Sequence, residues 1–306
     1  MKLLFYNDFV PGVLKGENVV DITNVIKDVS HVTPQDWMSG LISNFDQYKS
    51  DIETAVDKAD GIPVSQVRLR PPLPKPVHMV CMVGNYLENG ALKLANPLNA
   101  FLKSSSSVIG NNDTVVLPPD KASIFHHEAE LGIVVGNGAT DVNSKDVWDH
   151  IFGYVNFIDV SARGLHPASF LWGKSWDTFG PIGPYIVTAD EVADAQNLSV
   201  KLWVNGELRQ NYTTADMGRD IPDTFEWVTT IASLTPGDII ACGTNHQGLS
   251  ALQDGDKLEI EVADFGKLTV FVKDDLKREW PRSIDQATAD RIAGRTQTGG
   301  FGAPAG

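Results

Sequence analysis

The most informative stretch of this 306-residue sequence is Phe125-His126-His127-Glu128-Ala129-Glu130-Leu131-Gly132-Ile133-Val134-Val135. Its apolar and β-branched residues predict a strand, in which alternate side chains share one face. His126, Glu128 and Glu130 then point to the same side, with the two carboxylates about 7 Å apart. Leu131, Ile133 and Val135 occupy the opposite face. The stretch therefore predicts a strand that carries paired acids.

Two carboxylates so close together repel each other in a partly buried site, and a divalent cation between Glu128 and Glu130 would relieve that repulsion. Hard oxygen ligands suit Mg²⁺, Mn²⁺ or Ca²⁺ better than zinc. The alternative is a solvent-facing strand edge with two ordinary acids. From this stretch alone, both interpretations stand.

Two later segments add charged groups to this picture. The run Gly153-Tyr154-Val155-Asn156-Phe157-Ile158-Asp159 places an Asp in an apolar strand, where it is poorly suited unless it is paired or coordinating. Asp159 would complete a facial set of three carboxylates that leaves positions for water and substrate. Lys174 lies among aromatic residues and glycines in the segment 171–184 and could supply a fixed positive charge. The alternative for Lys174 is a surface side chain whose stem covers a Trp.

Farther out, the proline-rich segment 70–76 excludes regular structure and predicts an extended connector. Residues 1–70 before it predict a small α+β domain, with strands at 3–6 and 18–22 and a helical stretch at 33–59. After it, residues 71–284 predict a β-rich catalytic domain, a barrel or sandwich with one late helix at 223–234. Asn205-Gly206 is a strong hairpin signal. Residues 285–306 form a tail with a Gly/Ala-rich end. The strand predictions are 77–83, 114–117, 125–135, 153–161, 184–188, 198–204, 238–241, 257–262 and 267–272.

The formal net charge of −14 argues against nucleic acid and anionic membrane partners. An acidic protein that binds a small anion needs a local positive centre, and a bound cation is one. Cys81 and Cys242 have no pairing or zinc-binding spacing, which predicts reduced thiols. The short apolar N-terminus and the absence of any long apolar stretch predict a cytoplasmic protein.

In order along the chain, these segments resemble the fumarylacetoacetate hydrolase (FAH) superfamily. The resemblance covers roughly residues 72–274 and is carried by an ordered set of motifs. These are Val83-Gly84-Asn85-Tyr86, Phe101-Leu102-Lys103, Glu128-Ala129-Glu130-Leu131, Asp159-Val160-Ser161-Ala162-Arg163, Gly173-Lys174-Ser175-Trp176-Asp177-Thr178, Leu234-Thr235-Pro236-Gly237-Asp238 and Gly243-Thr244.

The resemblance implies a β-roll catalytic domain, usually dimeric, behind a small N-terminal domain. It implies a divalent cation, normally Mg²⁺ or Mn²⁺, held by Glu128, Glu130 and Asp159. It also implies that Lys174 contacts substrate or metal-bound water. The expected substrate-binding residues are Tyr86, Lys103, Arg163, Thr178 and Thr244.

The sequence departs from the family in one functional element. Hydrolytic members usually carry a His and a Glu in a helical lid after the Asn-Tyr pair, where this chain has Asn89 and Leu92. Glu88 could substitute, but one position along a helix rotates a side chain by about 100°. The usual pair that activates water is therefore missing from its usual place.

Two histidines stand where the family does not usually have them. His166 follows the Asp159 motif, and His246 lies in the polar cluster Asn245-His246-Gln247 after Gly243-Thr244. Either could act as a general base or acid, and the alternative for each is a loop histidine bonded to backbone. His246 is the better candidate. We expect His126 to support the carboxylates from behind.

The leading hypothesis is a metal-dependent enzyme that hydrolyses a C–C bond of an acylpyruvate-type 2-oxo acid, with Lys174 and His246 or His166 as catalytic residues. A metal-chelated 2-oxo acid gives a stabilised enolate, which decarboxylation, hydration and isomerisation can use as well. A decarboxylase, hydratase or isomerase is therefore the alternative, and a non-catalytic binding protein is a third. The expected partners are a small 2-oxo acid and a second copy of the chain in a homodimer.

Overall fold

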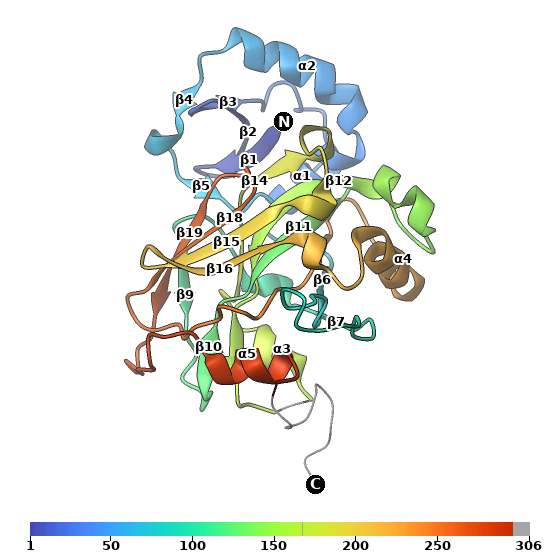
Figure 1. Ribbon diagram of the computed structural model, residues 1–306. Coiled ribbons are helices and arrows are strands. Elements are labelled where there is room, and N and C mark those ends of the chain that lie inside the picture. The colour runs from blue at the N-terminus through green and yellow to red at the C-terminus, as the bar shows by residue number, and fades with distance from the viewer. Residues whose placement is uncertain (167, 296–306) are drawn as a thin grey trace.

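The computed structural model describes residues 1–166 and 168–295, and it is a strand-rich α+β structure, as the sequence predicts. The N-terminal region stands at one end of the molecule, and the helices α3 and α5 stand at the other (Figure 1). The N-terminal elements are β1 (Lys2–Tyr6), β2 (Val10–Lys15), β3 (Asn18–Asp21), α1 (Pro34–Ser43), α2 (Phe45–Lys58), β4 (Ile62–Pro63) and β5 (Leu69–Arg70).

Most of the remaining strands belong to two sheets. A 12-stranded sheet combines β1 to β5 with β6 (Met79–Met82), β7 (Ala100–Leu102), β8 (Val108–Ile109), β11 (Ala129–Val135), β12 (Ile151–Ile158), β14 (Gly180–Thr188) and β17 (Ile239–Ala241). A five-stranded sheet has the order β16 (Glu207–Thr213), β15 (Ser199–Val204), β18 (Lys257–Val262), β19 (Leu268–Lys273) and β9 (Thr114–Val116). The strands β10 (Ile124–His126) and β13 (Ser161–Arg163) form a separate antiparallel pair.

The N-terminal region is joined to the larger part through the sheet itself. Strand β1 pairs antiparallel with β14, with Lys2 opposite Val187 and Leu3 opposite Ile186. The predicted helical stretch 33–59 forms two helices, which meet at Asn44. Thr33 and Asp36 make a reciprocal capping box at the start of α1, which satisfies two backbone N–H groups there. The region is thus an extension of the 12-stranded sheet with helices on one side.

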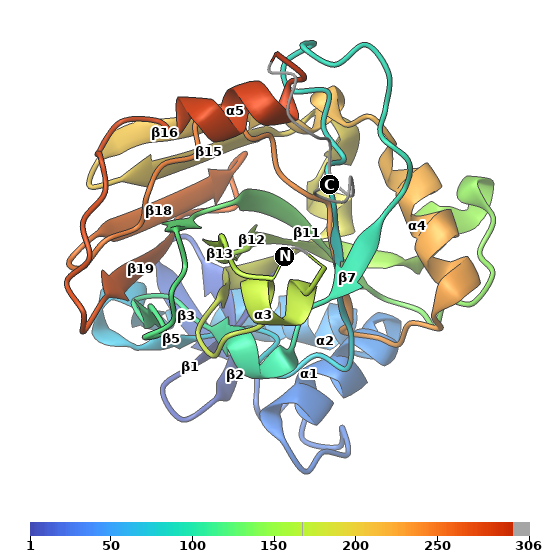
Figure 2. The ribbon, with the colours of Figure 1, turned by 90° about the horizontal axis from the view of Figure 1, so that it is seen from below.

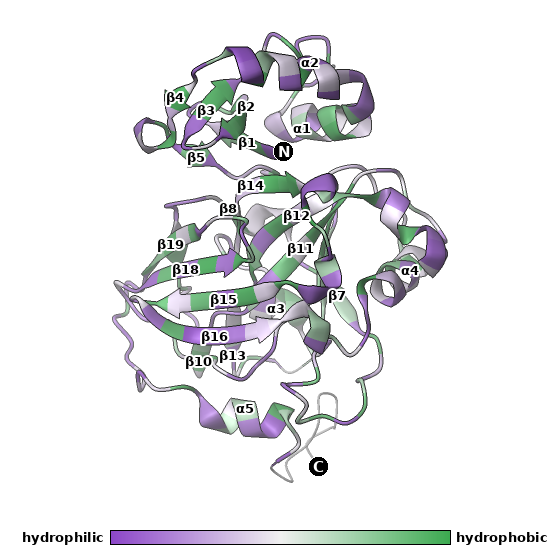
Figure 3. Ribbon diagram, turned by 45° about the horizontal axis from the view of Figure 1, so that its top comes forward, coloured by the Kyte–Doolittle hydropathy of each residue, from purple (hydrophilic) through white to green (hydrophobic). Residues whose placement is uncertain are grey.

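The large sheet is buried on both faces. Along β11, Leu131, Ile133 and Val135 belong to the core shared with the five-stranded sheet, whereas Val134 belongs to the core under the N-terminal helices. A strand that is covered on both faces has a nearly continuous apolar sequence. The mostly hydrophobic colour along β11 and β12 agrees with this (Figure 3). Strand β18 alternates between buried and half-exposed residues, because only one of its faces meets the core.

The remaining helices are α3 (Phe170–Lys174), α4 (Ile221–Ile231) and α5 (Gln286–Ile292). Helix α4 matches the late helix predicted at 223–234. The predicted hairpin joins β15 to β16, and Asn205 (φ 52°) and Gly206 (φ 81°) both adopt the left-handed backbone that its two-residue turn requires. Helix α5 lies within the predicted tail, whereas the Gly/Ala-rich end at 299–306 is outside the described residues. Within the described ranges, no helix has the length and apolar character needed to cross a membrane.

The segment 125–135 is not one continuous strand as predicted. Strand β10 ends at His126 and β11 begins at Ala129, so the chain leaves the β10–β13 pair and enters the large sheet at Glu128. The partner segment changes sheets at the same level, between Ile158 and Ser161. The backbone N–H of Asp159 donates to the carbonyl of Glu128 over 2.9 Å. This double crossing places Glu128 and Asp159 side by side.

Candidate metal centre and the pocket beside it

Three buried carboxylates meet at the double crossing, and we call Glu128, Glu130 and Asp159 the carboxylate triad. One oxygen from each lies within 4.8 Å of the others, and each residue is at most 4% exposed. The backbone N–H of Gly243 donates to Glu130 over 2.8 Å. Crowded carboxylate oxygens of this kind are the ligands that Mg²⁺, Mn²⁺ and Ca²⁺ prefer. The triad therefore fits a divalent cation.

The electrostatics of the triad agree with this fit. Burial raises the pKa of Glu130 well above its ordinary value, and the nearby charges of Asp159 and Glu128 raise it further. Burial also acts to raise the pKa of Glu128, but Lys174 and Arg163 outweigh it, and the pKa is lowered. Glu130 is therefore the member that an additional positive charge would stabilise most as a carboxylate.

Two lysines contact Glu128 and Asp159 of the triad. Lys103 Nζ donates to one oxygen of Asp159 over 2.6 Å, and Lys174 Nζ donates to the other over 2.5 Å. Lys174 also donates to Glu128 over 2.7 Å. Burial acts to lower the pKa of Lys174, but Asp159 and Glu128 outweigh it, and the pKa is raised. Both lysines thus act as fixed positive charges against the carboxylates.

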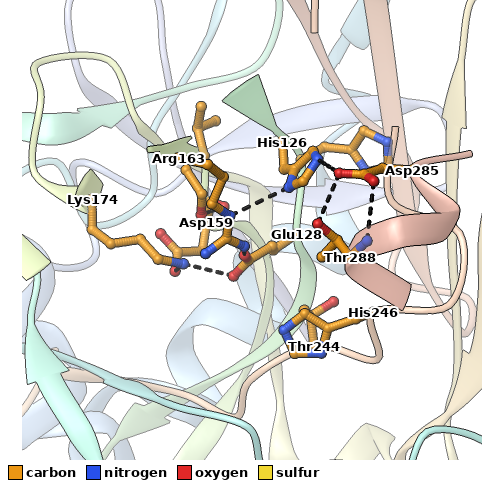
Figure 4. Close-up of polar contacts among 12 residues, drawn as sticks. His126, Glu128, Asp159, Arg163, Lys174, Thr244, His246, Asp285 and Thr288 are labelled. Atoms are coloured by element: carbon orange, nitrogen blue, oxygen red, sulfur yellow. Dashed lines mark hydrogen bonds and ion pairs between the residues drawn. The ribbon is translucent and has the colours of Figure 1, made fainter. Parts of the chain in front are cut away.

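A pocket opens beside the triad. In Figure 4, Lys174 reaches toward Glu128 from the left and Arg163 reaches toward it from above, with Thr244 and His246 nearby. Seen from below, α3, which ends at Lys174, lies in front of the large sheet (Figure 2). Stacked rings of Phe101 and Phe170, with centroids 4.8 Å apart, give the pocket an apolar wall. The lining residues are Met82, Val83, Gly84, Phe101, Glu128, Arg163, Phe170, Lys174, Thr244 and His246.

Outside the triad, Glu88 contacts His246. We call Glu88 and His246 the dyad. Glu88 Oε1 lies 2.7 Å from His246 Nδ1, and Glu88 Oε2 accepts from the backbone N–H of His246 over 2.9 Å. Both side chains are buried. A carboxylate at Nδ1 holds the proton there and leaves Nε2 as the basic ring nitrogen. The dyad thus has the arrangement of a general base with its orienting acid.

The backbone around Glu88 differs from the helical lid that the sequence predicts. Residues 88–90 form a turn. Glu88 (φ 57°) and Asn89 (φ 57°) both have left-handed backbone, so the 100° helical rotation does not apply. Gln247 Nε2 also donates to Glu88, over 2.9 Å. The carboxylate is therefore fixed by three donors from the 246–247 segment.

Only some of the residues expected to bind substrate line the pocket. Arg163 and Thr244 line the pocket, and the Thr244 hydroxyl donates to the carbonyl of Ala129 over 2.8 Å. The ammonium group of Lys103 is hydrogen-bonded to Asp159. Tyr86 is buried in the core against the ring of Tyr212, and Thr178 accepts from the backbone N–H of Val116 over 2.8 Å.

His166, the second histidine expected to act in catalysis, lies on an exposed loop. Its Nδ1 accepts from the backbone N–H of Ala168 over 3.2 Å, and it is not among the pocket-lining residues. Asp285, which contacts His126, was not singled out from the sequence, and Gln247 was named only as a member of the polar cluster around His246. Their partners are far away in the chain, so no local motif could have indicated these contacts.

Comparisons with known proteins agree with this geometry. The sequence model of the fumarylacetoacetate (FAA) hydrolase C-terminal family matches residues 79–273. The chain is 30% identical over 290 residues to a maleylpyruvate hydrolase of Aquipseudomonas alcaligenes, covering 89% of this chain and 99% of the relative. It is 33% identical over 220 residues to an oxaloacetate tautomerase of Bacillus subtilis (strain 168), covering 67% and 73%.

A solved structure is similar over nearly its whole length. It is the maleylpyruvate hydrolase from Sphingobium sp. SYK-6 in complex with manganese(II) ion and pyruvate, which matches with a TM-score of 0.82 and 36% identity. The match covers 90% of this chain and 99% of that one. Motifs, fold and sequence relatives agree, and the chain belongs to the fumarylacetoacetate hydrolase family.

Proposed function

We propose that this protein is a divalent-metal-dependent hydrolase that cleaves a C–C bond in an acylpyruvate-type 2-oxo acid, with maleylpyruvate as the first substrate to test. The observation that carries the proposal is that His246 of the dyad and Glu128 of the carboxylate triad line the same pocket. A hydrolase needs both an electron sink and a base for water. The similarity to two maleylpyruvate hydrolases supports the choice of substrate class.

Glu128, Glu130 and Asp159 would hold the cation, with Mg²⁺ or Mn²⁺ preferred and Ca²⁺ possible by the same oxygen chemistry. When bound, such a cation acts as a Lewis acid for the carboxylate and 2-oxo oxygens of a 2-oxo acid. The three negative charges of the triad are offset by Lys103, Lys174 and Arg163. A pocket with that balance attracts an anionic substrate once a cation is added.

The side chains of the pocket would bind and orient the substrate. Arg163 presents a guanidinium group to an anionic end, and Lys174 places an ammonium group where enolate charge develops. The Thr244 hydroxyl lies in the same lining. Phe101 and Phe170 cover the remaining side and limit the access of water.

His246 would perform the proton transfers. Its Nε2 takes a proton from a water molecule, and the resulting hydroxide forms a C–O bond with the C4 carbonyl carbon of the acylpyruvate. The C3–C4 bond then breaks, its electron pair remains on the pyruvate enolate, and the former C4 becomes a carboxylic acid. The imidazolium of His246 returns its proton to C3, which gives pyruvate. Glu88 stabilises the imidazolium in between.

Tautomerisation of a 2-oxo dicarboxylic acid such as oxaloacetate is the second candidate. A base beside an enolate-stabilising site can move a proton between C3 and solvent without any attacking water. Similarity to an oxaloacetate tautomerase favours this reaction as the alternative. Decarboxylation or hydration would need the same enolate stabilisation.

The test is a side-by-side assay with purified protein and Mg²⁺ or Mn²⁺. Maleylpyruvate and acetylpyruvate are followed by pyruvate release, and oxaloacetate is followed by enol absorbance and carbon dioxide release. We expect pyruvate from an acylpyruvate, with no turnover after chelation of the metal. Turnover of oxaloacetate without any pyruvate from acylpyruvates would replace the hydrolase assignment with the alternative.

A further inference from the structure

The C-terminal helix α5 lies beyond the residues matched by the family model, yet it contacts residues beside the pocket. Its N-cap residue is Asp285, whose carboxylate accepts from the backbone N–H of Thr288 over 3.1 Å and from its hydroxyl over 2.8 Å. Asp at this position stabilises the start of a helix. The same carboxylate also lies 3.0 Å from His126 Nε2, a contact that capping does not require.

His126 continues this contact toward the pocket. The ring is fully buried, and its Nδ1 accepts a hydrogen bond from Arg163 Nε over 3.3 Å. A neutral imidazole that accepts at Nδ1 carries its proton on Nε2, the nitrogen that faces Asp285. Arg163 in turn pairs with Glu128 and lines the pocket. A connected path therefore runs from Asp285 through His126 to Arg163 (Figure 4).

The same helix is anchored to the dyad side of the pocket. Gln247 Nε2 donates to the carbonyl of Ala289 over 3.2 Å, and Arg295 donates to Gln247 Oε1 over 2.6 Å. Gln247 is also a donor to Glu88. Because α5 is held at both sides of the site, Asp285 has a fixed position relative to the pocket.

We propose that Asp285 is a positioning residue that fixes the guanidinium group of Arg163 over the pocket through His126. The planar guanidinium binds a carboxylate well only in a defined orientation, so the hydrogen bond at Nε sets the direction of its remaining donors. The inference rests on the proposed function in one respect, namely that the pocket takes an anionic 2-oxo acid.

The test compares Asp285→Ser with Asp290→Ser. Serine is a good N-cap residue, so Asp285→Ser keeps the helix start while it removes the carboxylate from His126. Asp290 lies on the same helix, and its carboxylate pairs with Arg295 and Gln286 instead. Calorimetry measures the binding of oxalate, a stable 2-oxo acid mimic, to the Mg²⁺-loaded protein. We expect the Kd to rise about tenfold for Asp285→Ser, the scale typical of lost outer-shell partners, with little change for Asp290→Ser.

A spectroscopic readout keeps the test independent of catalysis. In ¹⁵N-histidine NMR of the Mg²⁺-loaded protein, His126 should be the Nε2–H tautomer in the wild type and in Asp290→Ser, and a tautomer mixture in Asp285→Ser. Equal oxalate affinity in the two variants, or an unchanged His126 tautomer in Asp285→Ser, would overturn the proposal. Failure of the proposed function has a different signature, namely no pyruvate release by the wild type, and it leaves the NMR comparison readable.

Discussion

The two sides of the pocket are built in different ways. The carboxylate triad and Lys174 come from neighbouring segments, with 46 positions between Glu128 and Lys174. The dyad joins two loop residues that are 158 positions apart in the chain. The triad is set by one double crossing of adjacent strands, whereas the dyad exists only because the loop after β6 and the loop after β17 meet.

Cation binding by the triad and proton transfer by the dyad can therefore be altered separately. Parallel pairing of β6 with β17 brings the ends of the two strands together, with Cys81 opposite Ala241, and so brings their following loops to the pocket. A side-chain substitution at Glu88 or His246 should leave the triad intact, because the hydrogen bonds of these side chains lie within the dyad and with Gln247 and not with the triad. Cation binding and proton transfer should therefore respond to different substitutions.

Glu130→Gln should have the largest effect. The amide keeps the side-chain shape and an acceptor for Gly243, but it removes a charged oxygen ligand. We expect loss of measurable Mg²⁺ and Mn²⁺ binding in calorimetry together with loss of turnover. The exposed Glu207→Gln is the matched control and should behave like the wild type. Unchanged turnover in Glu130→Gln would remove the triad from the account.

His246→Ala should separate the two sides. Removal of a general base typically costs roughly 10²–10⁴ in rate, so we expect a fall in kcat of about 10³. The Kd for Mg²⁺ should stay close to the wild-type value, because His246 is not a member of the triad. Steady-state kinetics and calorimetry on the same preparation check both statements. A larger loss in His166→Ala than in His246→Ala would transfer the base assignment to His166.

Glu88→Gln should be less severe. The amide can still accept a hydrogen bond from His246 Nδ1, but it does not stabilise the imidazolium by charge. We expect kcat to fall about 10- to 100-fold with KM nearly unchanged. Comparison with the double variant Glu88→Gln/His246→Ala tests the pairing, because two residues that act as one unit give strongly non-additive losses. Additive losses would mean that they act separately.

Gln247→Ala should have the smallest effect in this series. It removes one neutral donor to Glu88 and the contact with the carbonyl of Ala289. Loss of a single hydrogen bond to a charged group costs about 1.5–3 kcal/mol when fully expressed, and we expect a roughly three- to tenfold lower kcat. Stopped-flow measurement of pyruvate release is sensitive enough to detect this. A loss as large as that of His246→Ala would place Gln247 in the chemistry itself.

Much of the region around the carboxylate triad could be predicted from the sequence. Period-two patterning located β11, β12, β15 and β18, and an Asp in an apolar strand singled out Asp159 as a coordinating group. The break at Glu128 was not predicted, because a continuous run of β-formers hides a change of sheet partner. The pairing of β1 with β14 was also missed, since partners so distant in sequence leave no local signal.

Only one member of the dyad, His246, could be predicted from the sequence. His246 stood out as a histidine in a polar turn, but its acid was discounted on the assumption of a helix. The left-handed backbone at Glu88 and Asn89, which is uncommon for residues other than glycine, reverses that conclusion. Asp285 gave no signal in the sequence, because its partner His126 lies far away in the chain.

The most direct test of the proposed hydrolysis is the reaction of maleylpyruvate in H₂¹⁸O with Mg²⁺-loaded protein, followed by mass spectrometry of the products. We expect cleavage to pyruvate and maleate, with a water oxygen in the newly formed carboxylate of maleate. We also expect that Glu130→Gln and His246→Ala both suppress this product. Conversion of 2-oxo acids without C–C cleavage, or maleate without solvent oxygen, would contradict a hydrolytic role for the triad and the dyad.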